Sequence, residues 1–96
     1  MDANRFRLVA RVSSSNPQAI KPVLEKFITK GSVEKDDDEF IIDAEMQGID
    51  AKELNRSLLS ALRKAEKKTR LRAEWTSDDG TTSRFFDYVL RKTSKI

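Results

Sequence analysis

The sequence contains no cysteine and no histidine among its 96 residues. Without cysteine the chain cannot form a disulfide, a thiolate nucleophile or a thiolate metal site. Without histidine it lacks the usual general base and the commonest metal ligand. Ordinary zinc sites and catalysis by a Ser-His-Asp or Cys-His arrangement are therefore excluded. We expect a protein that is not an enzyme and that holds no cofactor and no metal.

Long hydrophobic runs are also absent. No apolar segment approaches the length of a membrane span, and the first residues, MDANRF, lead directly into a strand pattern. These features predict a cytoplasmic protein without a signal peptide or a membrane partner. The length suggests a single domain over residues 1–96, and the net charge of +3 permits nucleic-acid binding without requiring it.

Residues 69–92 hold four of the seven aromatic side chains, and the predicted fold is organised around them. Apolar and polar residues alternate in the first part of this stretch, as they do in a strand with one buried face. Residues 77–81 have turn chemistry, and Gly80 can take the positive φ that a hairpin needs. We expect one strand to follow, with Phe85 on its outer face and an apolar face formed by Phe86, Tyr88 and Leu90.

The preceding chain supplies strands and helices for this hairpin to join. Alternation predicts strands at residues 5–13, 32–35 and 40–47. The second helix follows Asp50, with Glu53 placed as in a capping box. For the first helix two readings stay open because of Pro22: a helix from Pro17 with a kink, or a turn followed by a helix over residues 22–30.

This order of elements predicts an α+β fold. The simplest arrangement is a ferredoxin-like βαββαβ two-layer sandwich with an extra C-terminal strand. We expect a five-stranded antiparallel sheet in the order 2-3-1-4-5, with two helices on one face.

Arginine is concentrated in the predicted strands, mostly pointing away from the helices. Its planar guanidinium suits phosphate and nucleotide contacts, and an open antiparallel sheet is how RNA-recognition modules present bases. The first group of candidate nucleic-acid-binding residues is Arg5, Arg7, Arg11, Arg70 and Arg72. Phe85 is the candidate exposed ring for stacking. The alternative is that these arginines only form cross-strand ion pairs, with Asp43, Glu45, Glu74 and Asp87 as partners.

Several other features suggest further contacts. Arg63 and Lys67 extend a basic side of the second helix that could follow a phosphate backbone, and Leu59 beside its apolar stripe could mark a partner surface. The acidic turn at residues 36–39 lacks the spacing of a calcium loop. Residues 13–16 could bind an anion at a helix N-terminus, although capping is the default explanation for them.

The segment 40–65 resembles the small dimerising subunit of the KEOPS tRNA-modification complex. That family has a strand of the type IIxDxxA, an acidic cap and a helix carrying Leu followed by NSYLR. The residues that match in order are Ile41, Ile42, Asp43, Asp50, Leu54, Ser60, Leu62 and Arg63. The resemblance implies a non-catalytic scaffold that dimerises and docks a larger enzyme acting on tRNA.

Three functional hypotheses follow from the sequence. The first is a non-enzymatic module that contacts RNA, such as a tRNA-like RNA, or an RNA-processing complex through its arginine-rich sheet and helix surfaces. The second is a homodimeric protein–protein scaffold that uses edge strand 2 or 5 or the helices, without nucleic acid. The third is a phosphate-ester hydrolase of acylphosphatase-like fold, which would use the loop after the first strand.

Overall fold

The computed structural model describes the backbone of residues 4–95 and the side chains of residues 4–91. Residues 1–3, which belong to the stretch where we expect no signal peptide, and residue 96 lie outside this range. The elements in chain order are β1 (Asn4–Ser14), α1 (Pro17–Phe27), β2 (Gly31–Asp36), β3 (Glu39–Gly48), α2 (Ala51–Ala65), β4 (Thr69–Ser77), β5 (Thr81–Phe86) and β6 (Val89–Lys95).

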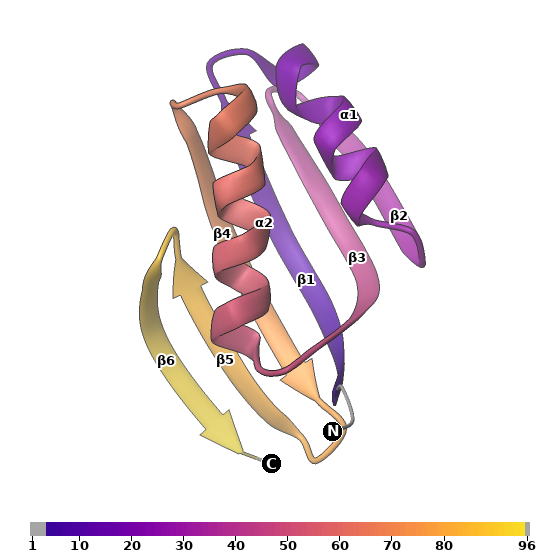
Figure 1. Ribbon diagram of the computed structural model, residues 1–96, viewed down its shortest axis with the longest axis vertical. Helices are drawn as coiled ribbons and strands as arrows, with labels where there is room; N and C mark the ends of the chain where they lie inside the picture. Colours follow the sequence, from indigo (N-terminus) through magenta and orange to yellow (C-terminus); the bar gives the residue numbers. More distant parts are fainter. Residues whose placement is uncertain (1–3, 96) are drawn as a thin grey trace.

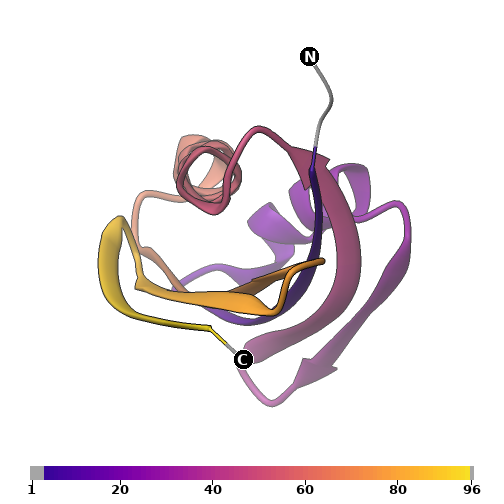
Figure 2. The same cartoon turned by 90° about the horizontal axis from the view of Figure 1, so that it is seen from below.

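The strands form one antiparallel sheet in the order β2-β3-β1-β4-β5-β6. Both helices cover the same face, and the sheet curves around them (Figures 1 and 2). The predicted α+β class and the order of the first five strands are confirmed. The open sheet with its two helices fits a ferredoxin-like arrangement. No helix in the described part of the chain has the length and apolar character needed to cross a membrane.

The prediction of five strands is wrong, because the expected last strand is two strands. A turn at Asp87 and Tyr88 separates β5 from β6, and Phe86 pairs with Val89 across it. Asp87 has a φ of 55°, the left-handed conformation that aspartate tolerates better than most residues. The expected apolar face of Phe86, Tyr88 and Leu90 is therefore also wrong, and all three side chains are exposed.

The core lies between the helices and the inner face of the sheet. Every second residue of β1 is buried, beginning at Phe6, and Trp75 on β4 is fully buried. Burying one large aliphatic or aromatic side chain contributes about 1.5–3 kcal/mol, so this alternation fixes which face of each strand meets the helices. Leu59 on α2 is also fully buried, which contradicts the expectation of a partner surface at that residue.

The first helix begins at Pro17 and continues through Pro22, so the expected start at Pro17 is confirmed and a helix over residues 22–30 is wrong. It ends at Phe27, where the amide of Ile28 still donates to the carbonyl of Leu24 at 2.8 Å. Gly31, at the start of β2, has a φ of 150°, and a Cβ there would lie 2.3 Å from the carbonyl oxygen of Asp43. Only glycine allows β2 to approach β3 this closely.

The second helix begins as its sequence predicts. The side chain of Asp50 accepts a hydrogen bond from the amide of Glu53 at 2.7 Å, which satisfies one of the free amides of the first turn. The carboxylate of Glu53 pairs with Arg56 one turn further along. By contrast, the side chain of Asn16 makes no capping hydrogen bond at the start of α1.

Candidate nucleic-acid interface

The face of the sheet that the helices leave open carries most of the arginines. Because side chains alternate, the buried residues of β1 and β4 leave their neighbours on this outer face. The strand register places Arg11 directly opposite Arg72, and Arg70 opposite Ser13. The structure thus brings the first group of candidate residues, Arg5, Arg7, Arg11, Arg70 and Arg72, to one exposed surface, as expected.

On the β1–β3 side of this surface the arginines are tied to carboxylates. Arg7 donates to both carboxylate oxygens of Asp43, from Nε at 3.2 Å and from a terminal nitrogen at 2.9 Å. This contact lowers the pKa of Asp43 and raises the pKa of Arg7. Arg11 contacts Glu39 at 3.4 Å. We call Arg7 and Arg11 with these partners the paired half of the outer face.

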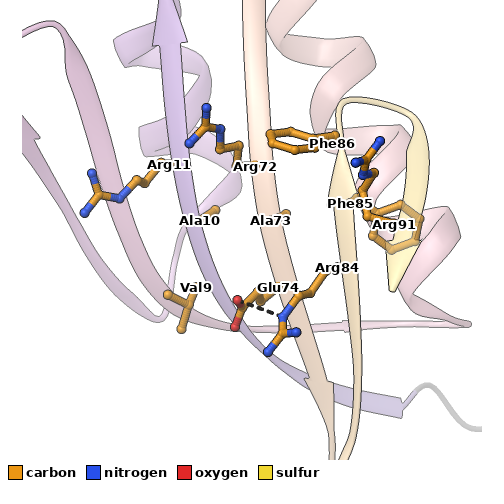
Figure 3. Close-up of a pocket in the computed structure, with 10 residues that line it drawn as sticks. All are labelled: Val9, Ala10, Arg11, Arg72, Ala73, Glu74, Arg84, Phe85, Phe86 and Arg91. Atoms are coloured by element: carbon orange, nitrogen blue, oxygen red, sulfur yellow. Dashed lines mark hydrogen bonds and ion pairs between the residues drawn. The ribbon is translucent and has the colours of Figure 1, made fainter. Parts of the chain in front are cut away.

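On the β4–β5–β6 side the arrangement is different. Among the described side chains, Arg72 and Arg91 have no carboxylate within ion-pair distance, and both stack on the ring of Phe86. Their guanidinium carbons lie 4.9 and 5.3 Å from the ring centre. Figure 3 shows the ring between the two guanidinium groups. We call Arg72, Phe86 and Arg91 the stacked half.

A hollow of about 320 Å³ lies beside the stacked half. Part of its lining is apolar, from the side chains of Val9 and Phe86. Glu74 and Arg84 close one side through an ion pair of 3.0 Å. The full lining, which Figure 3 shows, is Val9, Ala10, Arg11, Arg72, Ala73, Glu74, Arg84, Phe85, Phe86 and Arg91. Such an open hollow is a surface on which a flat or extended ligand can lie.

The charges around this hollow are not balanced locally. Arg11 and Arg72 are directly opposite each other on adjacent strands, and like charges in that position destabilise a sheet. Glu39 offsets the charge of Arg11, while Arg72 lies over the ring of Phe86 and has no ion-pair partner among the described side chains. An anion placed between these two side chains would relieve the repulsion.

A set of partly buried hydrogen bonds fixes the turn between β5, which ends at Phe86, and β6, which includes Arg91. The amide of Asp87 donates to the carbonyl of Leu71 at 2.7 Å, and its carboxylate accepts from the amide of Leu71 at 2.9 Å. The carbonyl of Asp87 accepts from the side chain of Asn55 at 2.7 Å. Asn55 in turn accepts from the indole of Trp75 at 3.2 Å. The β5–β6 turn is thereby held against both β4 and α2.

The expected stacking residue, Phe85, is not on this surface. It is only 5% exposed, because the β4–β5 register places it opposite Ala73 on the inner face. Its neighbour Phe86 is 40% exposed and lies opposite Arg72. Counting residues along both strands from the turn before Thr81 predicts that Phe86 is the exposed residue, because the turn gives each strand residue a defined partner. The sequence analysis missed both Phe86 and Arg91 as site residues.

The helix residues do not join the outer face either. Arg63 is directed to the chain itself: it donates to the carbonyl of Thr69 at 3.0 Å, contacts Asp87 at 3.4 Å and lies over the ring of Tyr88. Lys67 follows the end of α2 and is exposed. These two residues therefore belong to the helix side of the molecule, away from the hollow.

The cross-strand alternative is correct for part of the surface. Asp43 pairs with Arg7, Glu74 with Arg84, and Asp87 with Arg63 and Arg70, at 3.4 and 3.7 Å. Glu45 lies opposite Arg7 in the ladder, yet the arginine is engaged with Asp43 instead. Cross-strand ion pairs do not account for the positions of Arg72 and Arg91, which have no carboxylate partner among the described side chains.

The remaining sequence candidates have structural roles or no ligand geometry. Within the described residues, no group of three acidic side chains is arranged to hold a metal ion, and this includes the acidic turn after β2. In the loop after β1, Ser14 accepts hydrogen bonds from the amide of Asn16 and from the hydroxyl of Thr69. Comparison of the chain with protein-family models, with curated proteins and with solved structures found no match.

Proposed function

We propose that this chain is a non-enzymatic module that binds single-stranded RNA on the outer face of its sheet. The observation that carries the proposal is the stacked half, an exposed aromatic ring between two arginines that have no carboxylate partner among the described side chains. The ferredoxin-like arrangement supports it, since it leaves one sheet face open for a ligand.

Each part of the site corresponds to one part of an RNA strand. Guanidinium groups bind phosphate oxygens with two hydrogen bonds, and their planar faces also stack on bases. The apolar part of the hollow, at Val9 and Phe86, suits the face of a base. We place a phosphate between Arg11 and Arg72, because a negative charge there relieves their repulsion.

The shape of the site favours a single strand over a duplex. The bases of an RNA duplex are stacked inside it, so an exposed ring cannot reach their faces. In a single strand the bases are free to stack on aromatic rings and guanidinium planes. We therefore expect an unstructured RNA to bind more tightly than a duplex of the same length.

The test is a fluorescence-anisotropy titration of the chain with a labelled single-stranded RNA, at several salt concentrations. Log affinity should fall linearly with log salt, with a slope that reports the number of phosphate contacts. Phe86→Ala should weaken binding by about 1–3 kcal/mol, the usual contribution of one stacked base. Tyr88→Ala is the matched control, because Tyr88 is also exposed but lies against Ser60 and Arg63 of α2.

The possible results separate the proposal from its alternatives. Loss of affinity in the Phe86 variant alone supports the stacked half as the site. Equal loss in both variants, or no salt-dependent binding at low salt, contradicts it. A folded tRNA should be included as a second probe, because the resemblance of residues 40–65 to a subunit of a tRNA-modification complex stays a prediction.

A further inference from the structure

The two edges of the sheet differ in charge. The β2 edge contains the exposed residues Glu34, Lys35 and Asp36, and the exposed Asp37 and Asp38 follow directly, so acidic residues outnumber basic ones here. The β6 edge contains Arg91, Lys92 and Lys95 and no acidic residue. These strands lie on opposite sides of the molecule (Figure 1), so one chain carries an acidic edge and a basic edge.

The even number of strands also makes the two edges of the sheet suitable for antiparallel pairing with each other. Every neighbouring pair of strands is antiparallel, and the sheet has six strands. The two edge strands therefore run in opposite directions. If a second copy is placed beside the first in the same orientation, its β2 lies antiparallel to β6 of the first. The strands are similar in length, with six residues in β2 and seven in β6.

We propose that β6 of one copy pairs with β2 of the next, so that the sheet continues from chain to chain. An edge strand presents free backbone donors and acceptors, which a strand of another chain can satisfy. The opposite charges of the two edges would bring them together, and the outer faces of both copies would stay on the same side. This contact shares Arg91 with the proposed RNA site, and its other residues lie outside that site.

Charge disfavours the symmetric alternatives. If β6 paired with β6 of a second copy, the basic residues of the two strands would face each other, and like charges across a ladder are destabilising. Pairing of β2 with β2 would bring the two acidic edges together. The earlier expectation of edge pairing at strand 2 or 5 also needs correction, because β5 is interior and β6 is the edge.

Exposed apolar side chains at the start of β6 add a second reason for pairing. Val89 is 58% exposed and Leu90 is 53% exposed, although they occupy consecutive positions of a strand. Consecutive strand residues point to opposite faces, so the open edge has one exposed apolar side chain on each face of the sheet. A neighbouring β2 would cover part of both side chains.

The contact joins two different surfaces, which has a consequence for the assembly. Such head-to-tail contacts form closed rings or open chains rather than dimers that stop at two copies. We therefore expect the average mass to rise continuously with concentration beyond that of a dimer. High salt should lower it, because the contact depends on exposed charges.

The test is sedimentation velocity over a wide concentration range with two charge-reversed variants. Glu34→Lys with Asp36→Lys makes both edges basic, and Lys92→Glu with Lys95→Glu makes both edges acidic. Each variant alone should stay monomeric at concentrations where the original chain assembles. An equimolar mixture should assemble again, because each basic edge then meets an acidic one. Circular dichroism melting of each variant shows whether it is folded.

Four results would overturn the proposal. The first is a monomer at every concentration of the original chain, even at low salt. The second is a mass that stops at a dimer, which indicates a symmetric contact. The third is a folded variant that assembles alone as well as the original does. Binding of an acidic peptide to β6 without self-assembly would also contradict it, since the natural occupant of the edge would then be another protein.

Discussion

The paired half and the stacked half of the outer face contain the same residue type in the same strand environment. In the paired half, β3 supplies Asp43 and Glu39 within reach of the arginines of β1. In the stacked half, Arg72 and Arg91 lie over a ring instead. The difference shows that a strand arginine is a candidate ligand-binding group only when its neighbouring strand offers no carboxylate. The position of an arginine in the strand ladder is therefore a better guide to ligand binding than the number of arginines in the sheet.

The largest expected effect comes from comparing the two halves directly. Replacing Arg72 and Arg91 by glutamine removes two charges from the stacked half, and replacing Arg5 and Arg7 by glutamine removes two from the other end of the outer face. A hydrogen bond to a charged group contributes about 1.5–3 kcal/mol. We expect the first double variant to weaken RNA binding by about 3 kcal/mol or more, roughly a hundredfold.

The control for this comparison is the Arg5 and Arg7 double variant, which has the same net charge. It should weaken binding much less, because Arg7 is held by Asp43 and Arg5 lies near Asp78 at 3.9 Å. RNA titrations at the same salt concentration measure the affinities of both double variants. Equal weakening by the two variants would mean that only net charge matters and that the division into halves has no functional meaning.

A second prediction concerns the hydrogen bonds that hold the β5–β6 turn beside the stacked half. Asn55→Ala leaves the indole of Trp75 and the carbonyl of Asp87 without their partner in the interior. Leaving a buried polar group unsatisfied costs about 1–3 kcal/mol. We expect the free energy of unfolding to fall by roughly that amount in denaturant titrations. Asn16→Ala is the control, because this exposed side chain makes no capping hydrogen bond.

The smallest expected effect concerns the paired half and its pH dependence. The hydrogen bonds from Arg7 lower the pKa of Asp43 below its ordinary value of 3.8. A carboxyl whose pKa is lower in the folded state stabilises the fold above its unfolded pKa, and this contribution is lost as the pH falls through the folded pKa. We expect a small loss of stability below about pH 4.

Carboxyl NMR titration measures this directly. The midpoint for Asp43 should lie below its ordinary value of 3.8, and Arg7→Gln should return it toward that value. A midpoint that does not move in the variant would show that Arg7 and Asp43 do not interact in solution. The contact is exposed on both sides, so we expect the stability curve to change far less than the titration does.

Much of the fold could be predicted because it rests on local patterns. Alternation over β1, β3 and β4 identifies their inner faces, and Asp50 marks the start of α2 by its own chemistry. The face of the sheet that carries Arg11 and Arg72 follows from the same alternation. These features depend on residues close together in the sequence, so they can be predicted from the sequence alone.

The turn at Asp87 could not be predicted in that way. The residues from Phe85 to Leu90 are nearly all apolar, and no glycine or asparagine marks a break. The turn is fixed by Asn55 and Leu71, which lie far from it in the sequence. For this reason Arg91 was missed, since its position depends on where β5 ends, whereas the position of Phe86 follows from the β4–β5 register. Leu59 was missed because the buried side of α2 is wider than its main apolar stripe.

The position of β1 at the centre of the sheet affects how the chain folds. This strand comes first in the sequence, yet it pairs with β3 and β4, which follow much later. Contacts between residues so far apart slow folding, because long loops must close before they form. During synthesis one edge of β1 can pair with β3, and the other edge stays unpaired until residues 69–77 have left the ribosome. Charged side chains on an unpaired strand disfavour pairing with another chain, and the arginines of β1 supply such charges.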